Sequence, residues 1–158
     1  MEFRCAIGQD SHAFSDEKNK PLLLGGVEFD GKSLRANSDG DVVLHAITNA
    51  ISGITGINIL GDIADEMCNR GITDSKEYLK EALKYLKADI VNLSISIECK
   101  TPKISPKIRE MKESIGSILN ITADRVGITA TTGEGLTPFG QGRGIQVFCI
   151  LTVKQSLS

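Results

Sequence analysis

The spacing of hydrophobic and polar residues along the chain predicts a mixture of strands and helices. A two-residue period, in which every second side chain is apolar, is typical of a strand with one buried face. This period predicts strands at residues 3–9, 91–99, 125–132 and 145–153. In the second of these, the residues on one face are Val91, Leu93, Ile95 and Ile97. Two apolar triplets, 22–24 and 27–29, flank two glycines and predict a hairpin.

Helical periods predict three longer helices. They cover residues 38–54, a segment that starts near Thr73 or Asp74, and residues 106–119. In the second helix we expect a buried stripe made of Tyr78, Leu79, Ala82, Leu83 and Leu86. The segment 59–71 is predicted to be a mobile loop or a short helix around Asp62.

The helix at 38–54 has two different faces. Residues of one side are apolar and indicate a core contact: Val42, Val43, Ala46, Ile47, Ala50, Ile51 and Ile54. Residues of the other side form a polar stripe: Asp41, His45, Thr48, Asn49 and Ser52. The preceding Ser-Asp-Gly-Asp, residues 38–41, can cap the helix and suits the positive end of its dipole.

The order of the predicted elements indicates the fold class. Strand, hairpin, two helices, strand, helix and two strands favour an α+β two-layer sandwich. We expect a mixed, mainly four-stranded sheet with helices on one face. The length of 158 residues fits a single domain, residues 1–158.

Composition excludes several classes of function. The net charge of -2 and the aromatic content of 4% give no support for a nucleic-acid partner. No apolar run approaches the roughly 18 residues of a membrane span, so we expect no membrane partner. The first residues, MEFRCAIGQD, contain no secretory hydrophobic region and do not support plastid import. Four cysteines without a C-x-x-C pair predict free thiols in a cytoplasmic protein.

The two histidines of the chain suggest a metal centre. Asp10 and His12 are two residues apart, so an extended backbone would direct both side chains to one side. With His45 they would supply one carboxylate and two imidazoles, a donor set suited to Zn²⁺. Asp-x-His is a short pattern, however, and the alternative is a loop histidine and an unrelated histidine on a helix.

Two loops carry further candidate chemistry. The glycine-rich segment 131–144 matches no known phosphate-binding fingerprint, although Glu134 within it could bind a hard cation such as Mg²⁺. The segment 99–107 carries Lys100, Lys103 and Lys107 and could bind a phosphate or a base through backbone groups. A flexible connection and a solvated lysine loop are the simpler interpretations.

Several motifs, in this order, resemble those of the 2-C-methyl-D-erythritol 2,4-cyclodiphosphate synthases. They are IGQDSHAF, LLLGGVEF, SDGDVVLHAITNAI, LGDI, TDSKEYL, TPK and ATTGEGL, and together they span nearly the whole chain. The most specific is SDGD-x-x-x-HA combined with the upstream D-x-H.

The resemblance implies an activity and an assembly. The family closes 4-diphosphocytidyl-2-C-methyl-D-erythritol 2-phosphate into the cyclic diphosphate and releases CMP, in the non-mevalonate route to isoprenoids. It implies a homotrimer with active sites at the subunit interfaces, one Zn²⁺ per subunit, and a second divalent cation, Mg²⁺ or Mn²⁺.

The resemblance also assigns roles to individual residues. Asp10, His12 and His45 match the zinc ligands, Glu134 matches the ligand of the second cation, and Thr132 is a further catalytic candidate. The expected substrate-binding residues are Asn37, Ser38, Asp62, Cys99, Lys100, Thr101, Pro102, Lys103, Ile104, Ser105, Thr131, Thr132, Gly133 and Phe139.

Departures from the family pattern keep alternatives open. Asn37 stands where the family usually has His, and Asn49 where Asp is common. The segment that starts at Ala64 replaces an expected Phe-Pro-Asp loop, and Gln141 stands at a usual Arg. The alternatives are therefore a non-catalytic CDP-binding trimer that keeps a metal, or an enzyme for another nucleotide diphosphate.

Overall fold

A mixed four-stranded sheet forms one layer of the protein. The computed structural model describes residues 1–157. The sheet order is β1-β6-β4-β5, with β1 at Glu2–Ala13, β6 at Gly144–Gln155, β4 at Asp89–Glu98 and β5 at Val126–Thr131. β6 pairs antiparallel with both β1 and β4, whereas β5 runs parallel to β4. The two-layer α+β prediction is confirmed.

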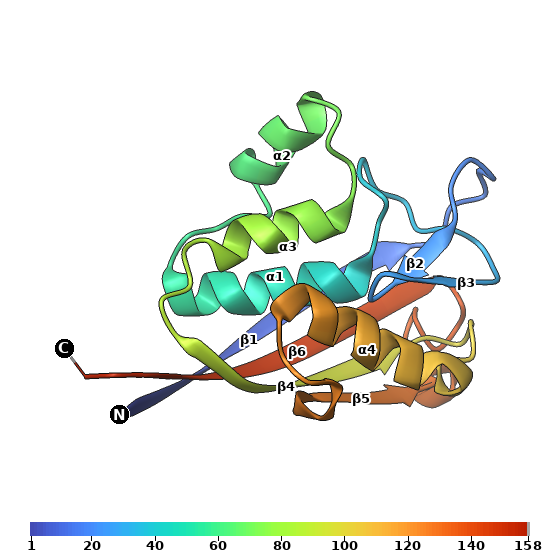
Figure 1. Ribbon diagram of the computed structural model, residues 1–158. Coiled ribbons are helices and arrows are strands. Elements are labelled where there is room, and N and C mark those ends of the chain that lie inside the picture. Colours follow the sequence, from blue (N-terminus) through green and yellow to red (C-terminus); the bar gives the residue numbers. More distant parts are fainter. Residues whose placement is uncertain (158) are drawn as a thin grey trace.

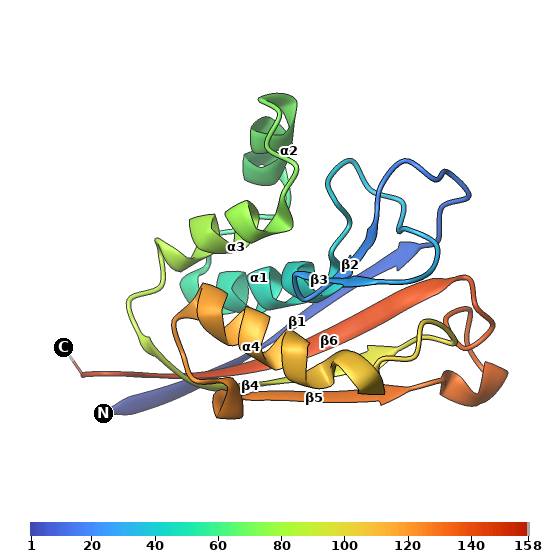
Figure 2. The ribbon, with the colours of Figure 1, turned by 45° about the vertical axis from the view of Figure 1, so that its right-hand side comes forward.

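The helices form the second layer on one face of this sheet (Figure 1). They are α1 at Val42–Thr55, α3 at Ser75–Leu83 and α4 at Ile108–Leu119. The short α2, Asp62–Asn69, stands farthest from the sheet, beyond α3 (Figure 2). Short 3-10 turns occupy Ser105–Lys107, Ala123–Arg125 and Gly133–Gly135. The described residues include no helix whose length and apolar character would allow it to cross a bilayer.

The predicted hairpin is confirmed as β2, Leu22–Leu24, paired with β3, Val27–Phe29. Gly25 and Gly26 connect the two strands with φ values of 65° and 78°. Positive φ at both central residues is what a type I′ turn requires, and glycine adopts it without strain.

β1 is longer than the alternating pattern predicted. Its pairing with β6 continues to Ala13 opposite Gly144, so Asp10 and His12 lie within the strand rather than beyond its end. This extension depends on a partner strand more than 130 residues away in sequence, which no local pattern records.

Two other predictions need correction. Val91 is only half-buried because the register shifts between Ile90 and Asn92, and Ile90 takes the buried position instead. α3 ends at Leu83, so Leu83 and Leu86 are half-buried, whereas Tyr78 and Ala82 are in the core as predicted.

α1 is the centre of the core. Ten of its residues are buried between the sheet and the other helices. It packs so closely on β1 that a Cβ atom at Gly8 would lie 2.0 Å from the carbonyl oxygen of Ala46. Only glycine at this strand position allows the approach, and the contact lies two residues from Asp10 and one from His45.

The other face of the sheet carries exposed apolar side chains. Phe3 and Ile7 of β1 are 62% and 63% exposed, and Ile150 and Phe148 of β6 are 52% and 37% exposed. Ile7 and Ile150 are direct partners in the β1–β6 register. These four residues, here called the open sheet face, form an apolar surface that no helix covers.

Candidate metal centre and the cavity around it

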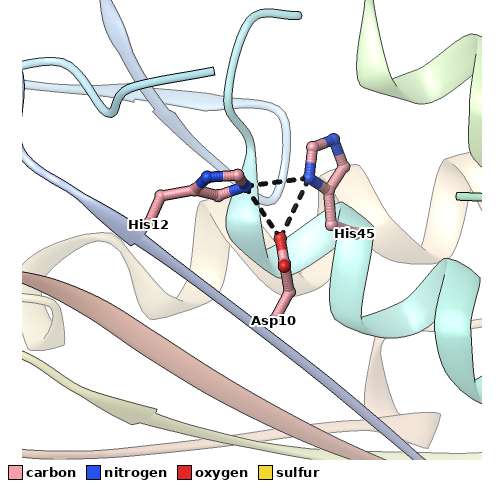
Figure 3. A group of neighbouring side chains, drawn as sticks. All are labelled: Asp10, His12 and His45. Carbon is pink, nitrogen blue, oxygen red and sulfur yellow. Dashed lines mark hydrogen bonds and ion pairs between the residues drawn. The ribbon is translucent and has the colours of Figure 1, made fainter. Parts of the chain in front are cut away.

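Asp10, His12 and His45 converge on one point (Figure 3). The Oδ2 atom of Asp10 lies 2.9 Å from Nε2 of His12 and 3.0 Å from Nδ1 of His45. The two ring nitrogens are 3.3 Å apart. The structure therefore brings together all three residues that the sequence suggested as metal ligands.

Local backbone geometry explains this convergence. Asp10 and His12 are alternate residues of β1 and point to the same side of the sheet, toward the helices. His45 projects from the first turn of α1, and the close packing at Gly8 brings that turn against β1. The three side chains thus come from the two most closely packed elements of the fold.

The size of the triangle fits a tetrahedral zinc ion. Zinc–nitrogen and zinc–oxygen bonds of about 2.0–2.1 Å imply ligand–ligand distances of about 3.3–3.4 Å in a tetrahedron. The three measured distances, 2.9, 3.0 and 3.3 Å, are within a few tenths of an ångström of that value. Three protein ligands would leave a fourth position for a substrate oxygen.

Asp10 is held in its charged form. Burial raises the pKa of its carboxyl group, but hydrogen bonds with His12 and His45 outweigh this effect and bring the pKa down to about 2. A carboxylate that stays ionised at neutral pH is a suitable anionic ligand for a divalent cation.

The other ring nitrogen of His45 also has a hydrogen-bond partner. Its Nε2 lies 2.8 Å from Oγ of Ser75, the first residue of α3. The Ser75 hydroxyl and backbone N–H in turn donate to the two carboxylate oxygens of Asp39. The Tyr78 ring packs beside His45, with the ring centroids 6.2 Å apart.

Sequence reasoning missed the participation of Asp39 and Ser75. The sequence pattern places Asp39 only in a helix cap and assigns no role to Ser75. The two residues are 36 positions apart and meet only through the packing of α3 against α1. No signal in a single sequence could have joined them.

The polar residues on α1 have different roles, and the expected helix cap is confirmed at Asp41. Asp41 is 1% exposed and caps the helix, and its carboxylate accepts N–H groups of Leu44, Gly25 and Gly26. Burial raises the pKa of Asp41, while those three hydrogen bonds oppose the rise. Thr48 donates to the carbonyl of Leu44 in its own helix.

Asn49, another polar residue of α1, contacts the backbone of β1. Its side-chain amide donates to the backbone carbonyl of Gln9 at 2.9 Å and so ties α1 to β1. A carboxylate cannot donate this hydrogen bond, so Asn49 has a structural explanation. Of the stripe residues, only His45 lines the cavity described next.

A cavity of about 1300 Å³ opens beside the three residues. Asn37 and Ser38, both predicted to contact substrate, line it. Lys20 donates to the carbonyls of Ala36 and Ser38, at 2.9 Å each, and thereby braces this wall. Arg35 also lines the cavity and was not predicted.

α2 forms the outer wall of the cavity. Gly61, Ala64, Asp65 and Cys68 line it, whereas the predicted residue Asp62 does not. Asp62 instead begins α2. The segment that departs from the family pattern is therefore a helix on the wall of the cavity beside the metal centre, and the role of Asp62 stays a prediction.

The remaining predicted residues form a second group at the ends of β4 and β5. These two strands lie on the other side of β6 from β1, which carries Asp10 and His12. None of them lines the cavity. They are Cys99, Lys100, Thr101, Pro102, Lys103, Ile104, Ser105, Thr131, Thr132, Gly133, Glu134 and Phe139.

Hydrogen bonds hold this second group together. The N–H of Cys99 donates to Thr131 at 3.1 Å, and that of Lys100 donates to Phe139 at 3.0 Å. Thr132 accepts from the N–H of Glu134, an exposed residue with a φ of 52°. The segments 99–105 and 131–139 therefore form one surface within a single chain.

Side chains of the 99–105 segment mainly fix its shape. Ile104 is 3% exposed, and the Cys99 thiol donates to the carbonyl of Pro102. Burial raises the pKa of Cys99 to about 11, so the thiol is protonated at neutral pH and is no nucleophile. Backbone groups and the exposed side chains of Lys100 and Lys103 are left for a ligand.

The chain matches one family model over most of its length. The model describes the YgbB family and matches residues 3–154. A curated 2-C-methyl-D-erythritol 2,4-cyclodiphosphate synthase from Chlamydia felis is 54% identical over 158 residues, which cover 97% of this chain and 90% of that protein.

Solved structures show the same fold. A 2C-methyl-D-erythritol-2,4-cyclodiphosphate synthase with CDP bound matches with a TM-score of 0.80 and 28% identity, over 96% of this chain and 100% of its own. The bifunctional IspDF from Campylobacter jejuni matches with a TM-score of 0.84 and 31% identity, over 98% of this chain. This chain spans only 43% of that bifunctional protein.

Proposed function

This chain belongs to the YgbB family, and we propose that it acts as a 2-C-methyl-D-erythritol 2,4-cyclodiphosphate synthase. It converts 4-diphosphocytidyl-2-C-methyl-D-erythritol 2-phosphate to the cyclic diphosphate and CMP, a step of isoprenoid biosynthesis by the non-mevalonate route. The observation that carries this conclusion is the triangle of Asp10, His12 and His45 beside a large cavity, in a chain 54% identical to a curated synthase.

The donor set of Asp10, His12 and His45 supports one metal site, and we propose a second from the resemblance to the family. Asp10, His12 and His45 would hold Zn²⁺, and Glu134 would contribute to a site for a second divalent cation, Mg²⁺ or Mn²⁺. When bound, such cations withdraw charge from the phosphates as Lewis acids. The carboxylate of Asp10 contributes the negative charge of the first site.

The reaction needs no nucleophile from the protein. An oxygen of the substrate's own 2-phosphate forms a bond to the β-phosphorus, and the bond from that phosphorus to the α-phosphate oxygen breaks. That oxygen leaves with CMP. Holding the two ends of one molecule together can lower such a barrier by up to roughly 7–11 kcal/mol.

Residues of the cavity wall would position the 2-phosphate end. The Ser38 hydroxyl oxygen accepts from the N–H of Gly40 at 3.2 Å, which leaves its hydrogen free to donate to a phosphate. The Asn37 side chain is exposed at the cavity and can donate through its amide. Lys20 keeps both residues in place through the carbonyls of Ala36 and Ser38.

The second group of residues would bind the cytidine end. The segment 99–105 would receive the cytosine largely through backbone groups, and Thr131, Thr132, Gly133 and Phe139 would lie near the diphosphate and the ribose. The CDP-bound relative supports a cytidine nucleotide as ligand.

A homotrimer would bring the metal centre of one subunit and the segments 99–105 and 131–139 of another into one active site. In a single chain no residue of 99–105 or 131–139 lines the cavity beside the metal centre, so we propose that a neighbouring subunit supplies these segments to the site. The open sheet face offers an apolar contact surface for this assembly. We infer a cytoplasmic trimer with active sites between subunits.

A non-catalytic CDP-binding trimer is not favoured. All three residues of the metal centre are present with ligand geometry, and the curated relatives are named as synthases. The departures at Asn37 and in α2 change the wall of the cavity, not the metal centre itself.

Mixed trimers test the shared active site. Asp10→Asn and Glu134→Gln should each abolish release of CMP, because each removes a ligand from every site. Co-expressed in equal amounts, they should regain about a quarter of wild-type activity, since that share of sites combines an intact metal centre with an intact Glu134 from a neighbour. Absence of any recovery in confirmed mixed trimers would place both groups in one subunit.

A further inference from the structure

The Ser75 hydroxyl is a buried polar group that helix formation does not explain. Ser75 is fully buried and is the first residue of α3. The helix is capped by the preceding residue, Asp74, whose side chain accepts from the N–H of Lys76. The hydroxyl of Ser75 is therefore free for another partner, and it lies 2.8 Å from Nε2 of His45.

The hydrogen atoms in this chain of contacts have one consistent arrangement. The carboxylate of Asp39 accepts from the N–H of Asp41 at 3.1 Å and from the N–H of Ser75 at 3.0 Å. As an acceptor it also takes the single hydroxyl hydrogen of Ser75. The Ser75 oxygen can then only accept from His45, which places the imidazole hydrogen on Nε2.

With its hydrogen on Nε2, a neutral His45 imidazole has a lone pair on Nδ1, and any hydrogen that Nδ1 shares with Asp10 in the absence of a metal is the one that a metal ligand gives up. Nδ1 is the atom that lies 3.0 Å from Asp10 and 3.3 Å from His12. A metal ligand must present such a lone pair, and the hydrogen bond on the other nitrogen determines which tautomer is present. The ring is also held in orientation, because Ser75 and Asp39 belong to two different segments that meet at this point.

We propose that Ser75 and Asp39 are positioning residues of the metal centre, which fix the tautomer and orientation of His45 for metal binding. The inference rests on the proposed metal site at Asp10, His12 and His45. It assigns to the first Asp of the SDGD motif a role distinct from that of Asp41, which caps α1.

A different result is expected if Ser75 and Asp39 have only a structural role. Asp39 also accepts from the backbone of α3, so it joins the segment before α1 to that helix. If joining these segments were the only role of Asp39, loss of the Ser75 hydroxyl would lower stability without changing metal affinity. Thr48 is a matched control, because its hydroxyl is equally buried on α1 but donates to Leu44 and not to His45.

Metal affinity and cobalt spectra separate the two roles. Competition with a chromogenic chelator measures zinc affinity for full-length wild type, Ser75→Ala, Ser75→Thr and Thr48→Val. The visible absorption spectra of the Co²⁺-substituted proteins report the geometry of the metal ligands. Ser75→Ala should bind zinc about 10–100-fold more weakly and change the cobalt spectrum. Ser75→Thr should restore both properties, and Thr48→Val should behave as wild type.

Asp39→Asn gives a second test in case Ser75→Ala does not fold. The amide of the introduced asparagine can donate to the Ser75 oxygen, so the Ser75 hydroxyl hydrogen turns toward Nε2 of His45. This favours the tautomer with its hydrogen on Nδ1, and zinc affinity should fall. Wild-type affinity and an unchanged cobalt spectrum in a folded Ser75→Ala or Asp39→Asn variant would overturn the inference. Failure of the wild-type chain to bind zinc would instead overturn the proposed metal site.

Discussion

Gly8→Ala should disturb both stability and metal binding, because Gly8 sets the separation of β1 and α1. An added Cβ would lie 2.0 Å from the carbonyl oxygen of Ala46 and 2.4 Å from the backbone nitrogen of Ala50. Contacts of this kind below 3.0 Å are essentially absent from real structures, so the helix must move by at least about 1 Å.

The expected loss of stability follows from the atoms that the added Cβ would contact. Overpacking a core typically costs about 1–3 kcal/mol, and we expect about 3 kcal/mol here because the atoms in the way are backbone atoms that cannot rotate aside. The same displacement moves His45 relative to Asp10. Metal–ligand distances tolerate only about 0.2 Å, so zinc affinity should fall by at least about tenfold.

Urea unfolding and chelator competition measure the two effects. Gly127→Ala is the matched control, since it makes the same change in a strand of the same sheet and its Cβ would meet nothing closer than 3.7 Å. The control should have wild-type zinc affinity. If Gly8→Ala had the stability and zinc affinity of the control, close packing at Gly8 would not be what positions the metal centre.

Three further substitutions test other parts of the account. Asp41→Ala should lower the free energy of unfolding by about 3 kcal/mol, because it removes a helix cap and leaves buried N–H groups in the β2–β3 turn unpaired; a loss below about 1 kcal/mol in urea unfolding would contradict this. Asn49→Asp should cost about 1–2 kcal/mol by the same assay, since it removes the donor to Gln9. Asn37→His should lower KM for the substrate by adding a group that can carry positive charge, and an unchanged KM and kcat would refute a phosphate contact at this position.

Local patterns predicted most of the helices and strands, because the formation of these elements depends mainly on neighbouring residues in the sequence. The two-residue and helical periods located the strands and helices, and the glycine pair located the hairpin. The two-residue spacing of Asp10 and His12 was sufficient to place both side chains on one side of a strand. His45, the only other histidine, was the third member of the proposed donor set, and the resemblance to a known family supported it; the structure brings it to the same point.

Features that depend on distant partners could not be predicted. β1 extends to Ala13 because β6 pairs with it, and the bulge near Val91 arises from the same kind of pairing. The roles of Thr48 and Asn49 on α1 could not be predicted, because a helical period does not show whether a polar side chain faces a cavity or a backbone group. The contact of Ser75 with His45 exists only after α3 packs on α1.

The most direct test of the central claim is to follow both products of the reaction. We expect the purified chain with zinc and Mg²⁺ to form CMP and the cyclic diphosphate in equal amounts, as measured by phosphorus NMR, and to form neither after treatment with a chelator. Asp10→Asn should match the chelated sample. CMP formed without the cyclic product, or at the same rate without metal, would contradict a metal-assisted cyclisation at Asp10, His12 and His45.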